Sequence, residues 1–318
     1  MRAIMEITEV KSTRSIRKKE VYKRLSEALA NGLRCDVTLA PHTTFGIGGR
    51  AEFFYRAVGP EALVFAVRTA QDLKVRFLLL GRGSNILVSD SGFRGLVIKN
   101  ECRGILVNGD NITCQSGALL EDVVNRACAH GLSGLEFAAG IPGTAGGAVR
   151  GNAGAFGKSV GDRLTKAVIL TTEGDVKEVS KKDFQFGYRE SRLKETRDVL
   201  LSATFQLRKG DTTEIEERIA GNLKRRKESL PSQEKSAGCF FKNVVLNGRK
   251  VSVGLLLDQV GAKRMRQADA KVFAGHANIL INAGAASAAD VRRLAAKLRR
   301  KIRGKFGIKL EQEVVYIN

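Results

Sequence analysis

The sequence has no tryptophan and few residues of the types that mark a metal-binding or disulfide-rich protein. Its three histidines, His42, His130 and His276, lie far apart, so no clustered spacing indicates a set of metal ligands, and we expect no metal site. The five cysteines are odd in number and form no Cys-x-x-Cys pair, which argues against a disulfide framework and a zinc ribbon. Because aromatic residues make up only 6% of the chain, platforms for stacking nucleic acid bases are scarce.

Long apolar runs are also missing, and none approaches the length of a membrane span. The basic run at residues 11–24 is not followed by the apolar region of a signal peptide. We therefore expect a cytoplasmic protein without a membrane partner. Its 318 residues, 43% of them hydrophobic, are enough for two or three domains with a sizeable core.

The net charge of +21 is compatible with a nucleic acid partner or with an anionic small substrate. Much of this charge lies in residues 11–24, 224–227 and 292–305. The last segment is predicted to be an amphipathic helix, because its apolar residues recur at helical spacing. That stripe consists of Val291, Leu294, Leu298 and Ile302. A solvated helix face explains the arginines and lysines around it better than a nucleic-acid-binding face, so we do not expect a nucleic acid partner.

The order of apolar patterns and turn residues predicts an α+β protein with at least two domains. We expect a basic, helical N-terminal segment at residues 1–35, a first domain at 36–210 and a second, smaller α/β domain at 211–318, where the composition changes. The patterns predict helices from Pro60, at 119–130 and at 211–229 before Pro231, and strands at 75–80, 95–99, 111–116, 167–172, 176–179, 199–207 and 309–317.

The segment from Ile141 to Gly157 is rich in glycine and carries one charged side chain, Arg150. Glycine permits unusual backbone angles and close approach, and successive N–H groups in such turns bind anions. A second glycine-rich turn, Gly81–Asn85, directly follows a predicted strand. It is neither a dinucleotide fingerprint, since position 86 is Ile86, nor a P-loop, since no Gly-Lys-Ser/Thr follows. Together the two turns suggest a site that holds one pyrophosphate from opposite sides.

Seven motifs follow one another along the chain: Thr43–Gly49, Gly81–Asn85, Gly134–Gly143, Gly151–Gly157, Phe186–Ser191, Ala237–Asn243 and Leu310–Glu313. They cover roughly residues 36–318, and seven in register make chance agreement improbable. Their order resembles the UDP-N-acetylenolpyruvoylglucosamine reductase family, a flavoenzyme family of bacterial peptidoglycan precursor synthesis.

The resemblance implies an FAD-binding domain of the vanillyl-alcohol-oxidase type followed by a smaller substrate domain. It also implies a two-step reaction, in which NADPH reduces the flavin and the flavin passes hydride to the enolpyruvyl β-carbon, with a proton added at the α-carbon. The substrate would be a UDP-sugar, UDP-N-acetylglucosamine enolpyruvate. Neither glycine-rich loop contains a histidine, so we expect the FAD to be non-covalent, and we expect a monomer.

The resemblance assigns the cofactor site to the two glycine-rich loops. The residues expected to cradle the pyrophosphate are Gly81, Arg82, Gly83, Ser84 and Asn85, with Ile141, Pro142, Gly143, Thr144, Gly146 and Gly147. Those expected along the flavin are Asn152, Ala153 and Gly154.

Three catalytic residues match family positions: Arg189, Cys239 and Glu313. An arginine can hold a carboxylate or enediolate through two hydrogen bonds. In the final predicted strand, Glu311 and Glu313 would point to one face, so period alone does not choose between them, and the family match selects Glu313. Cys239 stands where the family usually has the serine that delivers the α-proton. A thiol is more acidic than an alcohol but largely protonated at neutral pH, so this role remains possible.

The resemblance also implies substrate contacts by Tyr188, Arg226, Lys227, Lys242 and Asn243. Which of Arg225, Arg226 and Lys227 meets the substrate diphosphate stays open. The segment Gly275–Asn278 resembles a family segment, and we assign it no catalytic role.

Three alternatives remain at this point. One is an oxidase with the same FAD fold, which would have no reason to keep Arg189, Cys239, Glu313 and a basic diphosphate site together. Another is a nucleic-acid-binding protein built on the net charge. The third is an inactive flavin-binding relative, which the cysteine at position 239 makes conceivable.

Overall fold

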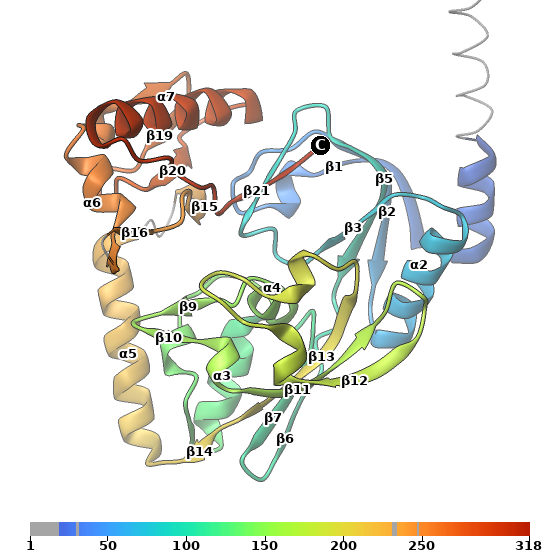
Figure 1. The fold of residues 1–318 in the computed structure, drawn as a ribbon. Helices are drawn as coiled ribbons and strands as arrows, with labels where there is room; N and C mark the ends of the chain where they lie inside the picture. The colour runs from blue at the N-terminus through green and yellow to red at the C-terminus, as the bar shows by residue number, and fades with distance from the viewer. Residues whose placement is uncertain (1–18, 30–31, 231–233, 247) are drawn as a thin grey trace, which may run out of the picture.

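The computed structural model describes residues 19–29, 32–230, 234–246 and 248–318 (Figure 1). Its first sheet has the strand order β1-β2-β5-β3. β2 (Arg50–Ala57), β5 (Phe93–Asn100) and β3 (Phe77–Leu80) run parallel, and β1 (Leu33–Thr38) lies antiparallel on the edge. Helix α2 (Pro60–Asp72) covers this sheet. Pro60 opens the helix as predicted, and Leu63, Val67 and Ala70 are buried.

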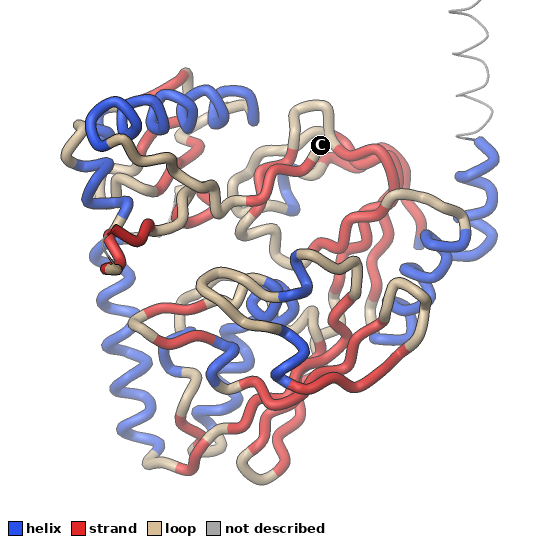
Figure 2. Tube along the Cα trace, in the orientation of Figure 1, coloured by secondary structure: helices blue, strands red, loops and turns tan. Residues whose placement is uncertain are grey.

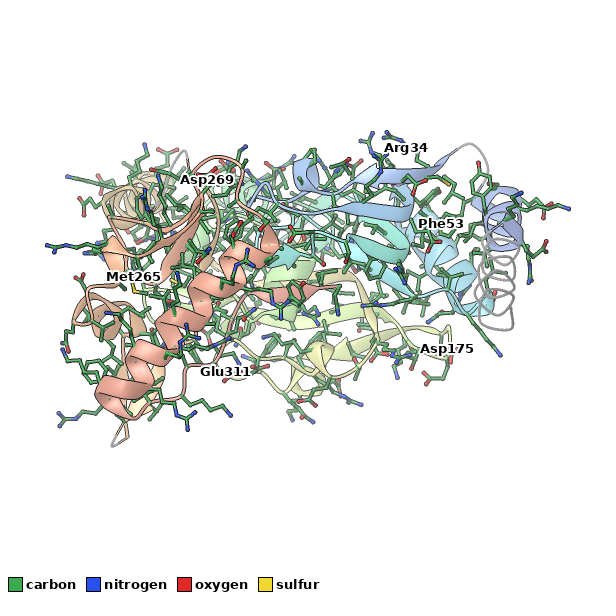
Figure 3. All side chains as sticks on the ribbon, turned by 90° about the horizontal axis from the view of Figure 1, so that it is seen from above. Arg34, Phe53, Asp175, Met265, Asp269 and Glu311 are labelled. Atoms are coloured by element: carbon green, nitrogen blue, oxygen red, sulfur yellow. The ribbon has the colours of Figure 1, made fainter. Side chains whose placement is uncertain are left out.

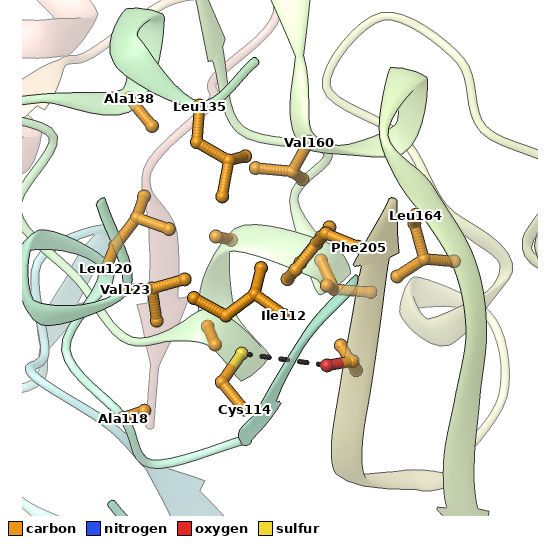
Figure 4. Packing of buried hydrophobic residues seen from close by; sticks show 14 of the residues in the cluster. Ile112, Cys114, Ala118, Leu120, Val123, Leu135, Ala138, Val160, Leu164 and Phe205 are labelled. Atoms are coloured by element: carbon orange, nitrogen blue, oxygen red, sulfur yellow. Dashed lines mark hydrogen bonds between the residues drawn. The ribbon is translucent and has the colours of Figure 1, made fainter. Parts of the chain in front are cut away.

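The second sheet is antiparallel throughout and has the order β12-β11-β13-β7-β6. Its strands are β6 (Ile105–Asn108), β7 (Asn111–Gln115), β11 (Leu164–Leu170), β12 (Val176–Ser180) and β13 (Val199–Gln206). Two helices, α3 (Leu120–Ala129) and α4 (Ala145–Arg150), pack against it. The core between them is apolar (Figure 4), and within it the Cys114 thiol donates to the Ala203 carbonyl oxygen at 3.8 Å. The strands and helix predicted in this region are confirmed to within a few residues.

A second lobe is built on the sheet β15-β20-β19-β18 (Figures 1 and 2). It contains β15 (Lys235–Cys239), β18 (Arg266–Gln267), β19 (Ala270–Val272), β20 (Ile279–Asn282), the hairpin of β16 (Val244–Leu246) and β17 (Arg249–Val251), and the helices α6 (Val253–Asp258) and α7 (Ala288–Phe306). Shorter elements of the chain are β4 (Ile86–Val88), β8 (Leu132–Ser133), β9 (Gly154–Ala155), β10 (Lys158–Ser159), β14 (Arg208–Lys209) and 3-10 helices at Ala40–His42, Glu136–Ala138, Val160–Asp162, Lys181–Phe184, Arg192–Lys194 and Ala262–Arg264.

Helix α7 confirms the amphipathic pattern. Ser287 and Asp290 form a reciprocal capping box at its start, and Gly307, with φ of 71°, ends it in the left-handed conformation. The predicted stripe of Val291, Leu294, Leu298 and Ile302 is fully buried against the sheet. The arginines and lysines therefore lie on the other faces of the helix.

Helix α5 (Thr212–Ser229) lies along the first part of the chain, although we assigned it to the second domain. The Asp211 side chain caps its start. The Asn222 amide donates to the Glu136 carbonyl oxygen at 2.9 Å, and Arg218 pairs with the Glu136 carboxylate at 3.2 Å. Pro231, the predicted helix stop, lies outside the described residues. The domain boundary at 210 stays a prediction.

The N-terminal segment is partly integrated into the first domain rather than appended to it. Residues 19–29 form a helix, and its Leu25 and Leu29 are buried in one cluster with Phe53. Tyr22 stacks on Phe53, which lies next to this helix in Figure 3. β1 already begins at Leu33. Residues 1–18 of the predicted segment lie outside the described part of the chain.

The predicted last strand, 309–317, is wrong over residues 309–314. Only Val315–Ile317 form a strand, β21, which pairs parallel with β4. Before it, Gln312 bridges to Phe241 in the second lobe. Within three residues the segment passes from the second lobe to the first. The Glu313 N–H donates to the Phe240 carbonyl oxygen at 2.9 Å, and the Val315 N–H donates to the Asn85 carbonyl oxygen at 3.0 Å. The C-terminal segment thus connects the two lobes.

The buried stripe of α7 gives a stability prediction. Leu298→Ala leaves a cavity against the sheet and is expected to lower the free energy of unfolding by about 2–5 kcal/mol. Leu255→Ala, at a position on α6 that is 64% exposed, is the matched control and should change it little. Denaturant unfolding followed by circular dichroism measures both. Equal effects of the two substitutions would contradict the packing described for α7.

Candidate active site

The two glycine-rich loops face each other, as predicted. Gly81–Asn85 connects β3 to β4, and Ile141–Gly147 leads into α4. The Ser84 hydroxyl donates to the Pro142 carbonyl oxygen at 2.7 Å. A Cβ atom on Gly81 would lie 2.6 Å from the Thr144 Oγ1. The absence of a side chain at Gly81 is therefore what allows the loops to approach.

The backbone of both loops fits the pyrophosphate of FAD. Gly83 has φ of 67°, a conformation that side chains rarely adopt. Among the described residues, the N–H groups of Arg82, Gly83, Ser84 and Asn85 donate no hydrogen bond to protein, and neither do those of Gly143 and Thr144. Two rows of unpaired N–H groups on facing loops form a cradle for a dianion.

Asn152, expected along the flavin, uses its side chain within the protein. It is buried with φ of 41°, its amide donates to the Gly187 carbonyl oxygen at 2.7 Å, and its Oδ1 accepts from the Gly161 N–H at 3.1 Å. It therefore fixes the loop that precedes Tyr188 and Arg189. Ala153 and Gly154 follow it into β9.

Arg189 has a left-handed backbone, with φ of 59°, which is unusual for a long side chain. Its Nη2 donates to the Gly154 carbonyl oxygen at 2.9 Å, which connects it to the segment expected along the flavin. Its Nε lies 2.8 Å from Oε1 of Glu313, although the N–H is not aligned for a hydrogen bond. The guanidinium is thus held beside the flavin segment.

Glu313 and Glu311 differ sharply in the exposure of their side chains, a difference that the period of the sequence could not predict. The side chain of Glu313 is 15% exposed, whereas that of Glu311, labelled in Figure 3, is 69% exposed and pairs with Lys242. Burial raises the pKa of the Glu313 carboxyl, and Arg189 opposes this rise. The Asn85 amide donates to the Glu313 backbone oxygen at 3.3 Å. The family position therefore coincides with the carboxylate that the fold places next to the cofactor loop.

Cys239 ends β15 at an irregularity of the strand pairing, where Gly238 has φ of 72°. It keeps some accessible surface, but protein atoms surround the thiol. Burial and the Glu313 carboxylate raise its pKa from 9.0 to about 11, while Arg189 and Arg226 act in the opposite direction. The thiol is consequently protonated at neutral pH and able to donate a proton.

Among the three candidate residues for the diphosphate, Arg226 is the one that reaches this cluster. Burial is the main cause that lowers the pKa of Arg226, and the positive charge of Arg189 lowers it further. A thiolate at Cys239 would raise this pKa. Its Nε is buried and has no hydrogen-bond partner among the described residues. Lys227 is exposed and lines a surface depression on α5 instead. Arg225 is exposed as well.

The remaining predicted substrate residues surround the same cluster. Burial raises the pKa of Tyr188, whose ring faces the Arg189 guanidinium at 5.5 Å. Lys242 forms ion pairs with Glu190 and Glu311. The Asn243 side chain accepts from the Val253 N–H at 3.1 Å, so its oxygen is engaged at the start of α6.

Sequence reasoning missed Lys250 and Lys194. The Lys250 Nζ lies 3.7 Å from the centre of the Tyr188 ring, and its pKa is lowered by burial and by Arg189. Lys194 donates to the Arg189 backbone oxygen and pairs with Glu190 at 3.6 Å. Neither residue belongs to a recognisable motif. Only the folding of the β16–β17 hairpin brings Lys250 to Tyr188.

In the Gly275–Asn278 segment, the Asn278 side chain has a structural role. It is buried, its Oδ1 accepts from the Phe241 N–H at 3.0 Å, and its amide donates to the Phe241 carbonyl oxygen at 2.8 Å. It therefore supports the segment that follows β15. The described part of the chain contains no group of His, Cys, Asp and Glu residues that could hold a metal ion.

No helix within the described ranges is both long and apolar enough to cross a membrane.

The facing loops and the cluster of Arg189, Glu313 and Cys239 fit an FAD-dependent oxidoreductase, and the comparisons with known proteins show that class. A family model described as an FAD binding domain matches residues 51–180, and one described as the C-terminal domain of UDP-N-acetylenolpyruvoylglucosamine reductase matches residues 230–317. The chain belongs to the UDP-N-acetylenolpyruvoylglucosamine reductase family. The predicted α+β fold with an FAD-binding domain is confirmed, and the family implies FAD and NADPH. That the domain is of the vanillyl-alcohol-oxidase type stays a prediction.

Relatives support this membership over most of the chain. The UDP-N-acetylenolpyruvoylglucosamine reductase of Carboxydothermus hydrogenoformans is 38% identical over 299 residues, which cover 93% of this chain and 96% of the relative. The reductase of Solibacter usitatus is 36% identical over 296 residues, which cover 88% of this chain and 95% of the relative. The crystal structure of the enzyme from Thermus caldophilus, 32% identical, superimposes with a TM-score of 0.77 and covers 90% of this chain and all of that one.

The contact between the loops predicts how FAD binding fails. In Gly81→Ala, the new methyl group would meet Thr144 and push the loops apart, so we expect FAD affinity to fall by about tenfold or more, equivalent to about 1.4 kcal/mol. Gly221→Ala on α5, where a Cβ meets nothing within 4 Å, is the control. Titration of the apoprotein with FAD, followed by flavin fluorescence, measures both. Unchanged affinity in Gly81→Ala would refute the cradle.

The electrostatics around the thiol predict its reactivity. Glu313→Gln removes the carboxylate that raises the pKa of Cys239, so at pH 9 iodoacetamide should modify Cys239 faster than in the wild type. Glu311→Gln should leave the rate unchanged. Peptide mass spectrometry gives the rates, and the exposed Cys35 serves as an internal standard. Equal rates in Glu313→Gln and the wild type would show that the carboxylate does not act on the thiol.

Proposed function

We propose that this protein reduces UDP-N-acetylglucosamine enolpyruvate to UDP-N-acetylmuramate with electrons from NADPH, in peptidoglycan precursor synthesis. The observation that supports this most strongly is the meeting of Arg189, Glu313 and a protonated Cys239 beside the two cofactor loops. An oxidase of the same fold would not need a proton donor opposite the hydride source. The proposal includes action in the cytoplasm as a monomer.

The loops Gly81–Asn85 and Ile141–Gly147 would hold FAD non-covalently, and FAD would supply hydride taken from NADPH. Hydride addition to the β-carbon breaks the π bond of the enolpyruvyl C=C and moves its electron pair toward the α-carbon and the carboxylate. The resulting enolate needs a fixed positive group. Arg189 supplies it, because its guanidinium is already held by Gly154 and Glu313. No movement of the arginine is then required as charge develops.

Cys239 completes the reaction by giving its S–H proton to the α-carbon, which leaves a thiolate that water must reprotonate. Its raised pKa keeps the proton in place until the enolate forms. Glu313 contributes twice: its charge opposes ionisation of the thiol, and its carboxylate holds the guanidinium or the developing enol. Arg226, with Lys242, Tyr188 and Asn243, binds the UDP part of the substrate, whereas Lys227 lies on the exposed surface of α5 and is left out of the proposal.

Anaerobic spectroscopy separates the two half-reactions. The holoenzyme should be yellow, lose colour with NADPH and regain it when UDP-N-acetylglucosamine enolpyruvate is added. A protein that bleaches but is not reoxidised by this substrate would refute the proposed reaction and leave an oxidase or an inactive relative. A colourless protein that cannot take up FAD and binds duplex DNA with a steep salt dependence would favour the nucleic acid alternative.

Substitutions of Cys239 test the proton donor. Cys239→Ser should retain substrate-dependent reoxidation of the flavin, because the hydroxyl can still donate. Cys239→Ala should slow it by about 10²–10⁴-fold, the usual contribution of a general acid, while reduction by NADPH continues. Stopped-flow absorbance at the flavin band resolves both steps. Reoxidation of Cys239→Ala at the wild-type rate would remove Cys239 from the mechanism.

A further inference from the structure

The tip of the β9–β10 hairpin carries a strained aromatic residue beside the site. Ala155 pairs with Lys158, so Phe156 and Gly157 form a two-residue turn, and both have positive φ, 51° and 78°. Such a turn favours Asn-Gly or Gly-Gly, and a bulky side chain at its first position is an outlier. Phe156 is also 46% exposed, so burial in a core does not explain it.

The Phe156 ring faces the guanidinium groups of α5. The Cζ atoms of Arg225 and Arg226 lie 5.8 Å and 5.9 Å from its centre, within the range of a cation–π contact. Arg226 also packs against Gly140, which has φ of 71°. A Cβ atom on Gly140 would lie 3.0 Å from Cδ of Arg226. The bare backbone of Gly140 and the ring of Phe156 thus both restrict the Arg226 side chain.

Arg226 benefits from such support because hydrogen bonding does not fix its Nε within the described part of the chain. Its Nε is buried without a hydrogen-bond partner among the described residues, and the like charge of Arg189 is close enough to lower its pKa. Two guanidinium groups that repel each other would separate toward solvent unless packing holds them. A guanidinium held at a fixed position can bind phosphate oxygens through two parallel hydrogen bonds.

We propose that Phe156 is a positioning residue that holds Arg226 in place to bind the diphosphate of the substrate. The strain of its backbone is retained because a residue suited to the turn would have no ring to place over the guanidinium. This inference rests on the proposed function, in which Arg226 meets the UDP part of the substrate. It adds a residue that acts through Arg226 rather than on the substrate itself.

Three substitutions at this position separate positioning from folding. Phe156→Leu keeps an apolar side chain but removes the ring, Phe156→Tyr keeps the ring, and Phe156→Asn gives the Asn-Gly pair that the turn prefers. Binding of inorganic pyrophosphate and of UDP-N-acetylglucosamine enolpyruvate to the oxidised holoenzyme is measured by calorimetry, with melting temperatures recorded in parallel. Phe65→Leu, at an exposed phenylalanine on α2, is the matched control.

We expect Phe156→Leu and Phe156→Asn to weaken binding of both ligands about tenfold, the size of a partly desolvated cation–π contact. Phe156→Tyr should bind like the wild type, and Phe156→Asn should melt no lower than the wild type. On the background of Arg226→Ala, Phe156→Leu should have no further effect. Wild-type affinity in Phe156→Leu, or a full additional loss on the Arg226→Ala background, would overturn the inference.

The two ligands keep this result distinct from the proposed function. Loss of pyrophosphate binding in Phe156→Leu supports the positioning role even in a protein that does not bind the enolpyruvate, an outcome that would refute only the proposed substrate.

Discussion

The site depends on one segment of chain, the residues around Glu313 that run between the two lobes. The Glu313 N–H donates a hydrogen bond to the carbonyl oxygen of Phe240, which follows Cys239 directly. The Glu313 carbonyl oxygen accepts a hydrogen bond from the Asn85 side chain in the first cofactor loop. β21 then adds to β4 in the first part of the molecule. This segment therefore fixes a carboxylate, a thiol and a cofactor loop relative to one another.

Most carboxylates within this arrangement are paired. Arg189 pairs with Glu313, Lys242 with Glu190 and Glu311, and Lys194 with Glu190. Arg226 and Lys250 add positive charge to the site, and burial and the charge of Arg189 lower the pKa of both. What matters is that burial opposes ionisation of Glu313 and Cys239, while Arg189 limits the effect on both. A thiol can then serve as an acid where an exposed thiol would be partly ionised under basic conditions.

Much of the fold follows from local patterns. The stripe of α7, the proline at the start of α2 and the glycine-rich turns each impose their structure within a few residues. The site residues came from resemblance, because no periodicity distinguishes Glu311 from Glu313 or Arg226 from its neighbours. Those choices depend on how β15, α5 and the C-terminal segment pack together. The same reason explains why residues 309–314 were wrongly predicted as strand and why Lys250 was missed.

The most direct test of this account is the pH dependence of flavin reoxidation by substrate, measured in single turnovers of the wild type and Cys239→Ser. With the Cys239 pKa raised to about 11, the rate of flavin reoxidation should stay constant up to pH 9 in each of the two proteins. A wild-type rate that declines near pH 9, with no such decline in Cys239→Ser, would mean that the thiol ionises like an exposed one. That result would contradict the claim that the fold holds Cys239 in its protonated form.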